Sequence, residues 1–258
     1  MLQSVQRRCK IGNVQSADRA LAILASFDED RPTLRVTELA TTLGMHKSTV
    51  SRLLATLHGR GLVRRDGELF SPGPELARLG ILASRGLDLS ELAEEPLARL
   101  AEDTGETVNL AVRQGDTALN VHQVQSSHLI GLGDWSGRAL PLHCTANGKA
   151  LLAWGGDEPA DLPARTPLTI TDRTRLREEL GEIRERGWAA AVEELELGLV
   201  AVAAPVFDAR GDVVAAVSLA APAYRLGPEA LAGIGERCAA TSREVSALLG
   251  FRPTPARN

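Results

Sequence analysis

The sequence predicts an α+β protein in which an N-terminal winged helix-turn-helix is joined by a linker helix to a C-terminal domain with a mostly antiparallel sheet. Two observations predict the first domain: two short helical patterns meet at Gly44, and the hairpin signal Asp66-Gly67 follows them closely. A third observation predicts the second domain, because strand and helix patterns alternate after the turn-forming segment Ser71-Pro72-Gly73-Pro74.

The first two helices are each predicted from a capping residue and an apolar stripe. Ser16 and Thr37 can accept an unpaired backbone N–H group at the start of a helix. Apolar residues follow each of them at helical spacing, namely Ala20, Ile23, Leu24 and Phe27 in the first helix and Leu39, Ala40 and Leu43 in the second. Gly44 then ends the second helix, because glycine adopts a positive φ at little cost.

The third helix is expected to present two unlike faces. Its buried stripe has i, i+3, i+4, i+7 spacing and consists of Val50, Leu53, Leu54 and Leu57. The opposite face is small, polar and basic, which suits the major groove, where arginine binds guanine edges or phosphate. We therefore expect operator contacts from Lys47, Ser48, Thr49, Ser51 and Arg52. The alternative is an ordinary amphipathic helix pair with a solvated face.

Residues 62–70 are predicted to form two short strands around Asp66-Gly67. A hairpin directly after a recognition helix is the wing of a winged helix. Arg64 and Arg65 are expected to reach phosphates or the neighbouring minor groove. Three helices and a wing make a complete small DNA-binding domain, which favours DNA binding over the amphipathic-pair alternative.

The composition fits two domains of unlike charge. The chain of 258 residues is 44% hydrophobic, enough to fill real cores. Residues 1–75 contain 11 Lys and Arg against 8 Asp and Glu, whereas residues 76–258 contain 18 against 25. A mildly basic part beside an acidic part fits a protein that meets phosphate with one half only.

Several features favour a cytoplasmic protein without membrane contact. No apolar run approaches the roughly 18 residues of a membrane span, and residues 1–10 lack the apolar core of a signal peptide. The three cysteines, Cys9, Cys144 and Cys238, are odd in number and widely spaced, which fits a reducing compartment rather than a disulfide framework.

After the break, Pro74 suits the first turn of a linker helix. A second helix is expected to begin at Ser90. Further strands are predicted over residues 107–113, 117–124, 200–207 and 213–220, and further helices over residues 172–187 and 228–249. The predicted domains are therefore residues 13–73, 74–86 and 87–250.

Segments in both parts resemble the isocitrate lyase regulator (IclR) family of bacterial transcription factors. They are residues 36–40 (VTELA), 43–54 (LGMHKSTVSRLL), 141–153 (PLHCTANGKALLA), 186–188 (RGW), 193–199 (EELELGL) and 203–207 (AAPVF). The resemblance covers about residues 13–250. It implies a winged helix, a linker helix and a GAF-like C-terminal domain that binds a small organic effector. It also implies a homodimer or dimer of dimers on palindromic double-stranded operator DNA, as a repressor or an activator.

Residues 145–149 are expected to open a helix, and the free N–H groups at such a start bind a carboxylate. The resemblance implies that backbone amides of Ala146 and Asn147 bind the effector in this way. It also implies that small polar side chains on the sheet complete the pocket. At the matching positions the family favours Asp, Cys, Ser and Ser, whereas this chain has Ala191, Ala201, Ser218 and Ala220.

At these four positions the chain therefore offers one hydroxyl group and three methyl groups to a ligand. This departure predicts a larger or more apolar effector, such as an aromatic or aliphatic acid, or no small-molecule effector at all. Leu129, Leu132 and Leu140, on the loop before the helix, are expected to line the mouth. The alternative is that Ser218 and the alanines are ordinary sheet packing.

The cysteine and histidine side chains give only weak evidence for catalysis or metal binding. Cys144 beside His143 could pair as nucleophile and base, but neighbours on a strand point to opposite faces, which favours a buried cysteine. His122, His128 and His143 with Cys144 match no zinc spacing.

Glu193, Glu194 and Glu196 could form an acid–base set, but a solvated loop at the pocket rim is favoured. We therefore predict a regulator that is not an enzyme, with no catalytic residues, no metal and no cofactor. The alternatives are a DNA-binding regulator whose C-terminal domain only oligomerises, and a small-molecule hydrolase on that domain.

Overall fold

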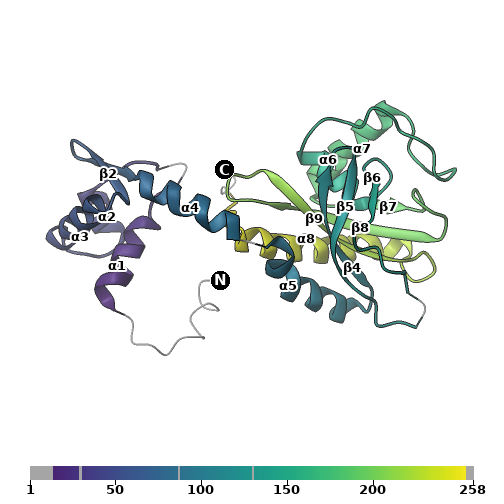
Figure 1. The fold of residues 1–258 in the computed structure, drawn as a ribbon, viewed down its shortest axis with the longest axis horizontal. Helices are drawn as coiled ribbons and strands as arrows, with labels where there is room; N and C mark the ends of the chain where they lie inside the picture. The colour runs from purple at the N-terminus through teal and green to yellow at the C-terminus, as the bar shows by residue number, and fades with distance from the viewer. Residues whose placement is uncertain (1–13, 29–30, 87, 130, 254–258) are drawn as a thin grey trace. The chain divides into compact units, whose positions relative to one another are not determined.

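The computed structural model describes residues 14–28, 31–86, 88–129 and 131–253. The chain forms two compact units, residues 1–87 and residues 88–258, and each has its own hydrophobic core (Figure 1). The predicted linker helix belongs to the first unit, whereas Cys9 lies outside the described residues. Within the described ranges no helix combines the length and apolar character needed to cross a membrane.

Three helices form the body of the first unit: α1 (Gln15–Leu24), α2 (Val36–Thr42) and α3 (Lys47–Gly59). The residues predicted for the stripes do form its core, in which Ile23, Leu39, Ala40, Val50, Leu54 and Leu57 are buried. Gly44 has a φ of +61°, as the turn between α2 and α3 requires.

The predicted caps of α1 and α2 are wrong. Ser16 and Thr37 lie inside the first turn, and the N-cap positions belong to Val14 and Arg35. At α2 a carboxylate replaces the expected hydroxyl, since Glu38 accepts a hydrogen bond from the Arg35 N–H group at 2.6 Å. A carboxylate in the first turn also complements the helix dipole, so α2 begins without a hydroxyl cap.

The wing is a hairpin of β2 (Val63–Asp66) and β3 (Leu69–Pro72), which confirms the prediction. The turn lies one residue later than expected, because Asp66 pairs with Leu69 and leaves Gly67 and Glu68 in the loop. Gly67 has a φ of +59°, and glycine at the first loop position suits a type II′ turn. A third strand, β1 (Leu34–Arg35), pairs with β3, but two residues are too few to show an alternating pattern.

The linker helix α4 (Pro74–Gly86) has the predicted bounds. Its start is held by the segment that follows α3. The Gly73 N–H group donates to the Leu62 carbonyl at 2.9 Å, and the Glu75 N–H group donates to the Gly61 carbonyl at 3.2 Å. The start of the linker helix is therefore fixed to the three-helix body of the first unit.

A six-stranded antiparallel sheet in the order β6-β5-β4-β9-β8-β7 forms the second unit. Its strands are β4 (Thr107–Gln114), β5 (Thr117–Val124), β6 (Ala139–Pro141), β7 (Ala189–Val192), β8 (Leu199–Phe207) and β9 (Val213–Pro222). The four longer strands match the prediction within two residues. The sequence pattern does not predict β6 and β7, because both are short edge strands.

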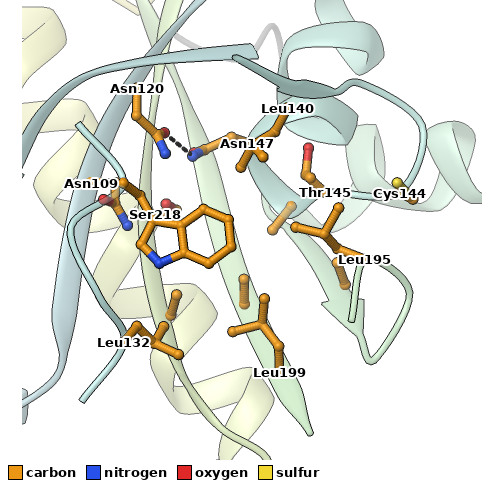
Figure 2. Close-up of a pocket in the computed structure, with 15 residues that line it drawn as sticks. Asn109, Asn120, Leu132, Leu140, Cys144, Thr145, Asn147, Leu195, Leu199 and Ser218 are labelled. Atoms are coloured by element: carbon orange, nitrogen blue, oxygen red, sulfur yellow. Dashed lines mark hydrogen bonds between the residues drawn. The ribbon is translucent and has the colours of Figure 1, made fainter. Parts of the chain in front are cut away.

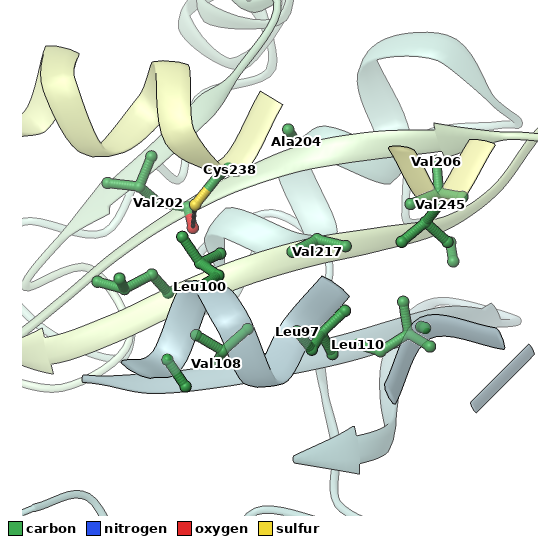
Figure 3. Close-up of a cluster of buried hydrophobic side chains, with 14 of the residues drawn as sticks. Leu97, Leu100, Val108, Leu110, Val202, Ala204, Val206, Val217, Cys238 and Val245 are labelled. Carbon is green, nitrogen blue, oxygen red and sulfur yellow. Dashed lines mark hydrogen bonds between the residues drawn. The ribbon is translucent and has the colours of Figure 1, made fainter. Parts of the chain in front are cut away.

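One face of the sheet carries long and branched aliphatic side chains, which pack against α5 (Leu89–Thr104) and α8 (Leu231–Leu248) (Figure 3). This core includes Leu97, Leu100, Val108, Leu110, Val202, Val206, Val217, Cys238 and Val245. Two helix starts differ from the prediction. Asp88, not Ser90, caps α5 by accepting from the Ser90 N–H group at 2.9 Å, and Pro228–Ala230 forms a 3-10 turn before α8.

The opposite face is lined by alanines and covered by α6 (Ala146–Trp154) and α7 (Arg173–Arg186) (Figure 1). Its alanines include Ala111, Ala118, Ala189, Ala191, Ala203 and Ala216. They leave room for α6, which packs so closely that a Cβ atom on Gly148 would overlap the backbone of Leu142. The predicted ends of α7 are confirmed: Asp172 caps its start, and Gly187 ends it with a φ of +83°.

Candidate functional site

The N-terminal half of α3 is the first part of the candidate site. Lys47, Ser48, Ser51 and Arg52 are exposed, and Thr49 is half-buried. The opposite side of α3 is buried in the core. The structure therefore gathers the five predicted residues at one end of a helix that is otherwise anchored by its apolar stripe.

His46 is a residue of this region that sequence reasoning missed. It occupies the N-cap of α3, and its Nδ1 atom accepts from the Ser48 N–H group at 3.3 Å. The same Nδ1 atom lies 2.7 Å from the Ser48 hydroxyl oxygen. The imidazole thus orients a side chain that is predicted to contact DNA. A histidine two residues before a serine at a helix start was the available signal.

The wing arginines differ in their surroundings. Both are exposed, but the Arg65 Nε–H group donates to the Gly67 carbonyl at 2.9 Å, and its guanidinium lies 5.8 Å from the Phe70 ring centroid. A hollow between α2, α3 and the wing is lined by Arg35, Thr37, Ser51, Ala55, His58 and Arg65, among others. The fold therefore brings Arg65 and Ser51 together and adds Arg35 and Thr37, which were not predicted as site residues.

The second part of the candidate site is a pocket between the alanine-lined face of the sheet and the start of α6 (Figure 2). The cavity has a volume of about 50 Å³ and opens to solvent. Most residues predicted for the effector lie here, namely Leu132, Leu140, Ala146, Asn147, Ala191, Ala201, Ser218 and Ala220.

The prediction that Leu129 lines the mouth of the pocket is wrong, because this side chain is fully exposed and does not line the pocket. The loop before it is fastened elsewhere: the Ser126 hydroxyl donates to the Gly105 carbonyl at 2.6 Å, and the His128 N–H group donates to the Ser126 hydroxyl at 3.1 Å. The bond from Ser126 to Gly105 ties this loop to the end of α5, and Leu129 points into solvent. Trp135, further along the same loop, lines the pocket.

The pocket is more polar than the sequence predicts, because three asparagine amides line it: Asn109, Asn120 and Asn147. Asn109 pairs directly with Ser218 across β4 and β9, and the Asn147 Nδ2 atom donates to Asn120 Oδ1 at 3.3 Å. Figure 2 shows these four side chains gathered on one side of the pocket, with Leu132 and Leu199 on the other. The four predicted sheet positions do contribute one hydroxyl and three methyl groups, but the amides add polar groups that the sequence analysis did not include. Strand register, which the sequence alone does not give, would have revealed Asn109.

The start of α6 has the geometry of an anion site. The Thr145 hydroxyl accepts from the Gly148 N–H group at 3.1 Å, and the first intrahelical bond runs from Lys149 N–H to the Thr145 carbonyl at 2.9 Å. The N–H groups of Ala146 and Asn147 precede that bond, so they have no partner within the helix. They lie at the positive end of the helix dipole, where a carboxylate is favoured.

A buried ion cluster lies behind the pocket. The Lys149 side chain is 0% exposed, and its Nζ atom lies 2.6 Å from Glu179 Oε1 and 2.7 Å from Glu194 Oε1. Burial raises the pKa of the Glu194 carboxyl, and Lys149 opposes this shift. The expectation that Glu194 belongs to a solvated loop is therefore wrong. A lysine within the apolar helix ANGKALLAW was the signal that sequence reasoning missed.

His143 and Cys144 do not act as a pair. The His143 ring Nε2 atom donates to the Pro163 carbonyl at 3.1 Å, and burial lowers the pKa of the imidazole, which favours its neutral form. His122 lies near Glu94 and His128 near Glu106, so the three histidines face different partners. Among the residues that the structure describes, no three His, Cys, Asp or Glu side chains are placed to hold a metal ion.

The Cys144 thiol lines the pocket, and burial raises its pKa to about 11. The thiolate is the reactive form, so we expect iodoacetamide to alkylate Cys144 very slowly in the folded protein near neutral pH. Labelling should accelerate as the pH approaches about 11 or when the protein unfolds. The measurement is mass spectrometry of a Cys9→Ser variant, in which Cys238, with a pKa raised to about 12, is the internal control. Rapid labelling of Cys144 at neutral pH would contradict this expectation.

Comparison with known proteins identifies both units. Residues 16–67 match the IclR helix-turn-helix domain, and residues 82–247 match the bacterial transcriptional regulator IclR C-terminal domain. The HTH-type transcriptional regulator BhcR of Paracoccus denitrificans is 35% identical over 246 residues, which cover 91% of this chain and 87% of BhcR. The transcriptional repressor IclR of Escherichia coli is 33% identical over 250 residues, which cover 93% of this chain and 91% of IclR.

Similarity extends to solved structures. The crystal structure of Pseudomonas aeruginosa HmgR has a TM-score of 0.79 at 31% identity and covers 93% of this chain and 100% of the HmgR chain. The winged helix-turn-helix, the antiparallel sheet domain and their order along the chain therefore agree with the resemblance seen in the sequence. The family consists of transcriptional regulators, and no comparison supports a hydrolase. The chain belongs to the IclR family of bacterial transcriptional regulators.

Proposed function

We propose that this regulator binds a palindromic operator as a homodimer or dimer of dimers, and that a small organic carboxylate in the second unit controls the binding. The observation that carries the first half is the exposed, polar and basic N-terminal end of α3, anchored on its other side by a buried stripe. The same end of a recognition helix contacts base edges in helix-turn-helix proteins.

In this proposal Lys47, Ser48, Thr49, Ser51 and Arg52 contact bases and nearby phosphates, and Arg64 and Arg65 bind the DNA backbone. Small side chains such as Ser51 and Ala55 let α3 approach the floor of the major groove. Two copies of the domain then bind two half-sites one helical turn or a multiple of it apart, which makes the operator palindromic.

The pocket supplies the control in this proposal. The effector carboxylate binds the N–H groups of Ala146 and Asn147, beside Ser218, Ala191, Ala201, Ala220 and Leu132. An effector changes operator affinity only if it binds one arrangement of the dimer more tightly than another. We propose that it changes the spacing of the two recognition helices and so favours or disfavours the operator.

Selection of genomic fragments by the purified full-length protein tests the DNA-binding half. We expect a small set of fragments that share a palindrome and shift at nanomolar protein in gels. Uniform retention of unrelated fragments would contradict sequence-specific DNA binding.

A thermal-shift screen with organic acids tests the effector half of the proposal, because a ligand specific to the folded state raises the melting temperature. A screen without any stabilising acid would favour a C-terminal domain that only oligomerises.

Arg64→Ala is expected to weaken binding to operator and unrelated DNA alike and to make binding less salt-dependent. Each phosphate contact that is lost reduces the slope of log K against log salt by about 0.9, so the two wings of a dimer together account for roughly 2 units. Fluorescence anisotropy at several salt concentrations measures this slope. Arg177→Ala, in the second unit, is the matched control and should leave the slope unchanged. A slope equal to that of the wild type in the Arg64 variant would exclude a phosphate contact.

A further inference from the structure

The buried polar atoms of the pocket indicate which chemical class of effector fits. We infer that the effector is a monocarboxylate that also carries hydrogen-bond donors, either hydroxyl or N–H groups, on its carbon skeleton. This inference rests on the proposed role of the pocket as the effector site. It replaces the apolar acid that the sequence alone predicts.

Two side-chain oxygens in the pocket have no hydrogen-bond partner among the described residues. Asn109 is 5% exposed and Asn147 is 8% exposed, and the Oδ1 atom of each is unpaired. The Nδ2 atom of Asn147 is already engaged with Asn120 Oδ1, which leaves its carbonyl oxygen as the free group. Both oxygens are acceptors, so they call for donors on the ligand.

The position of Asn109 on the sheet explains why its oxygen remains available. Asn109 alternates with Ala111 on β4 and therefore faces the alanine-lined side of the sheet, opposite Ser218 on β9. Alanine neighbours cannot form hydrogen bonds with it. Buried polar groups in native proteins are almost always paired, so two unpaired acceptors around one cavity indicate a ligand that pairs them.

Charge restricts the ligand further. None of the described side chains that line the pocket belongs to Asp, Glu, Lys or Arg. A cationic group would meet no opposite charge there. A single carboxylate is matched by the free N–H groups at the start of α6, but a second carboxylate would have no comparable partner.

The side of the pocket away from the amides is apolar and can contact the hydrocarbon part of a ligand. Leu132 and Leu199 lie across the pocket from the amides in Figure 2, and Trp135 also lines the pocket. The Trp135 backbone is held by the Gln123 side chain, whose Oε1 atom accepts from the Trp135 N–H group at 2.9 Å. A ligand with an apolar side and a donor-bearing side therefore matches the two walls.

The test uses the full-length protein and probes that share one skeleton. The first set is cyclohexanecarboxylate with its 3,4-dihydroxy, 3,4-dimethoxy and 4-carbamoyl derivatives, and parallel sets use benzoate and hexanoate skeletons. Isothermal titration calorimetry and thermal shift measure binding. We expect at least one donor-bearing member to bind roughly tenfold or more tightly than both its parent and its methoxy analogue, because these leave buried acceptors unpaired. The dihydroxy and carbamoyl members distinguish hydroxyl from N–H donors.

Two contrary outcomes are distinguishable. If parent or methoxy acids bind as tightly as the donor-bearing members, the inference about ligand class is wrong and the effector pocket stands. If no member of any set binds or alters operator affinity, the effector function fails, and the inference fails with it.

Asn109→Ala provides a second, independent readout. Removal of this acceptor should lower the ratio of affinities for the donor-bearing acid and its parent by about tenfold. Leu132→Ala is the matched control, because it removes apolar contact with both acids and should leave that ratio unchanged. A ratio unaffected by Asn109→Ala would remove Asn109 from donor recognition and overturn its assigned role.

Discussion

Replacement of Arg52 by Ala is expected to abolish specific operator binding while the protein stays folded. Arg52 is exposed on α3, two positions from the buried Val50 and Leu54, so its removal exposes no core surface. A bidentate arginine–guanine contact contributes about 1–3 kcal/mol of discrimination, and a dimer loses two such contacts. Operator and unrelated DNA should then bind with similar affinity in gel-shift titrations, while circular dichroism and the oligomeric state match those of the wild type.

Arg60→Ala is the matched control for this prediction. Arg60 is also exposed, but it follows the C-terminal end of α3, far from the end that is proposed to contact base edges. Its removal should at most weaken binding to all DNA by a similar factor. Specific binding that survives in the Arg52 variant would refute the assignment of α3 as the reading helix.

Replacement of Lys149 by Met is expected to destabilise the second unit strongly. It removes the cation that faces Glu179 and Glu194 and leaves the largely buried Glu194 carboxylate without an opposite charge. Loss of one partner of a buried ion pair destabilises by about 3–5 kcal/mol. Urea denaturation of the full-length protein, followed by a signal from the second unit, measures the difference.

The destabilisation should depend on pH in a defined direction. Burial already raises the pKa of the Glu194 carboxyl, and removal of Lys149 takes away the interaction that opposes this shift. A carboxyl with a raised pKa binds its proton more readily in the folded state, so the free energy of unfolding rises as the pH falls. The deficit in the free energy of unfolding of Lys149→Met relative to wild type should therefore shrink as the pH is lowered from neutral into the acid range.

Glu194→Gln combined with Lys149→Met tests the cause of the deficit. The double variant removes the unpaired charge and should recover part of the lost stability at neutral pH. If neither low pH nor the Glu194 substitution restores any of the lost stability, the loss comes from packing of the lysine side-chain stem and not from the unpaired charge.

The features that the sequence predicted correctly depend mainly on residues that are close together in the chain. Spacing of Val50, Leu54 and Leu57 gave the buried side of α3, and Asp172 and Gly187 marked the ends of α7 correctly. These features depend on neighbours within a few residues. The cap predictions at Ser16 and Thr37 were wrong because other residues nearby could start the helices equally well.

Features that depend on distant residues were missed. Asn109 enters the pocket because β4 pairs with β9, more than a hundred residues away, in one particular register. Lys149 finds Glu179 and Glu194 only after α7 and the loop beyond β7 fold onto α6. The identity of the pocket lining and of its ion cluster is therefore a property of tertiary structure.

The two faces of the six-stranded sheet have different side chains and different neighbours. Valine and leucine side chains on one face hold the sheet to α5 and α8, whereas alanines form much of the pocket on the other. A single-nucleotide change converts an alanine codon to serine, threonine or valine without altering the first face. If the pocket is the proposed effector site, single substitutions at Ala191, Ala201 or Ala220 would therefore change its ligand preference while the domain stays folded.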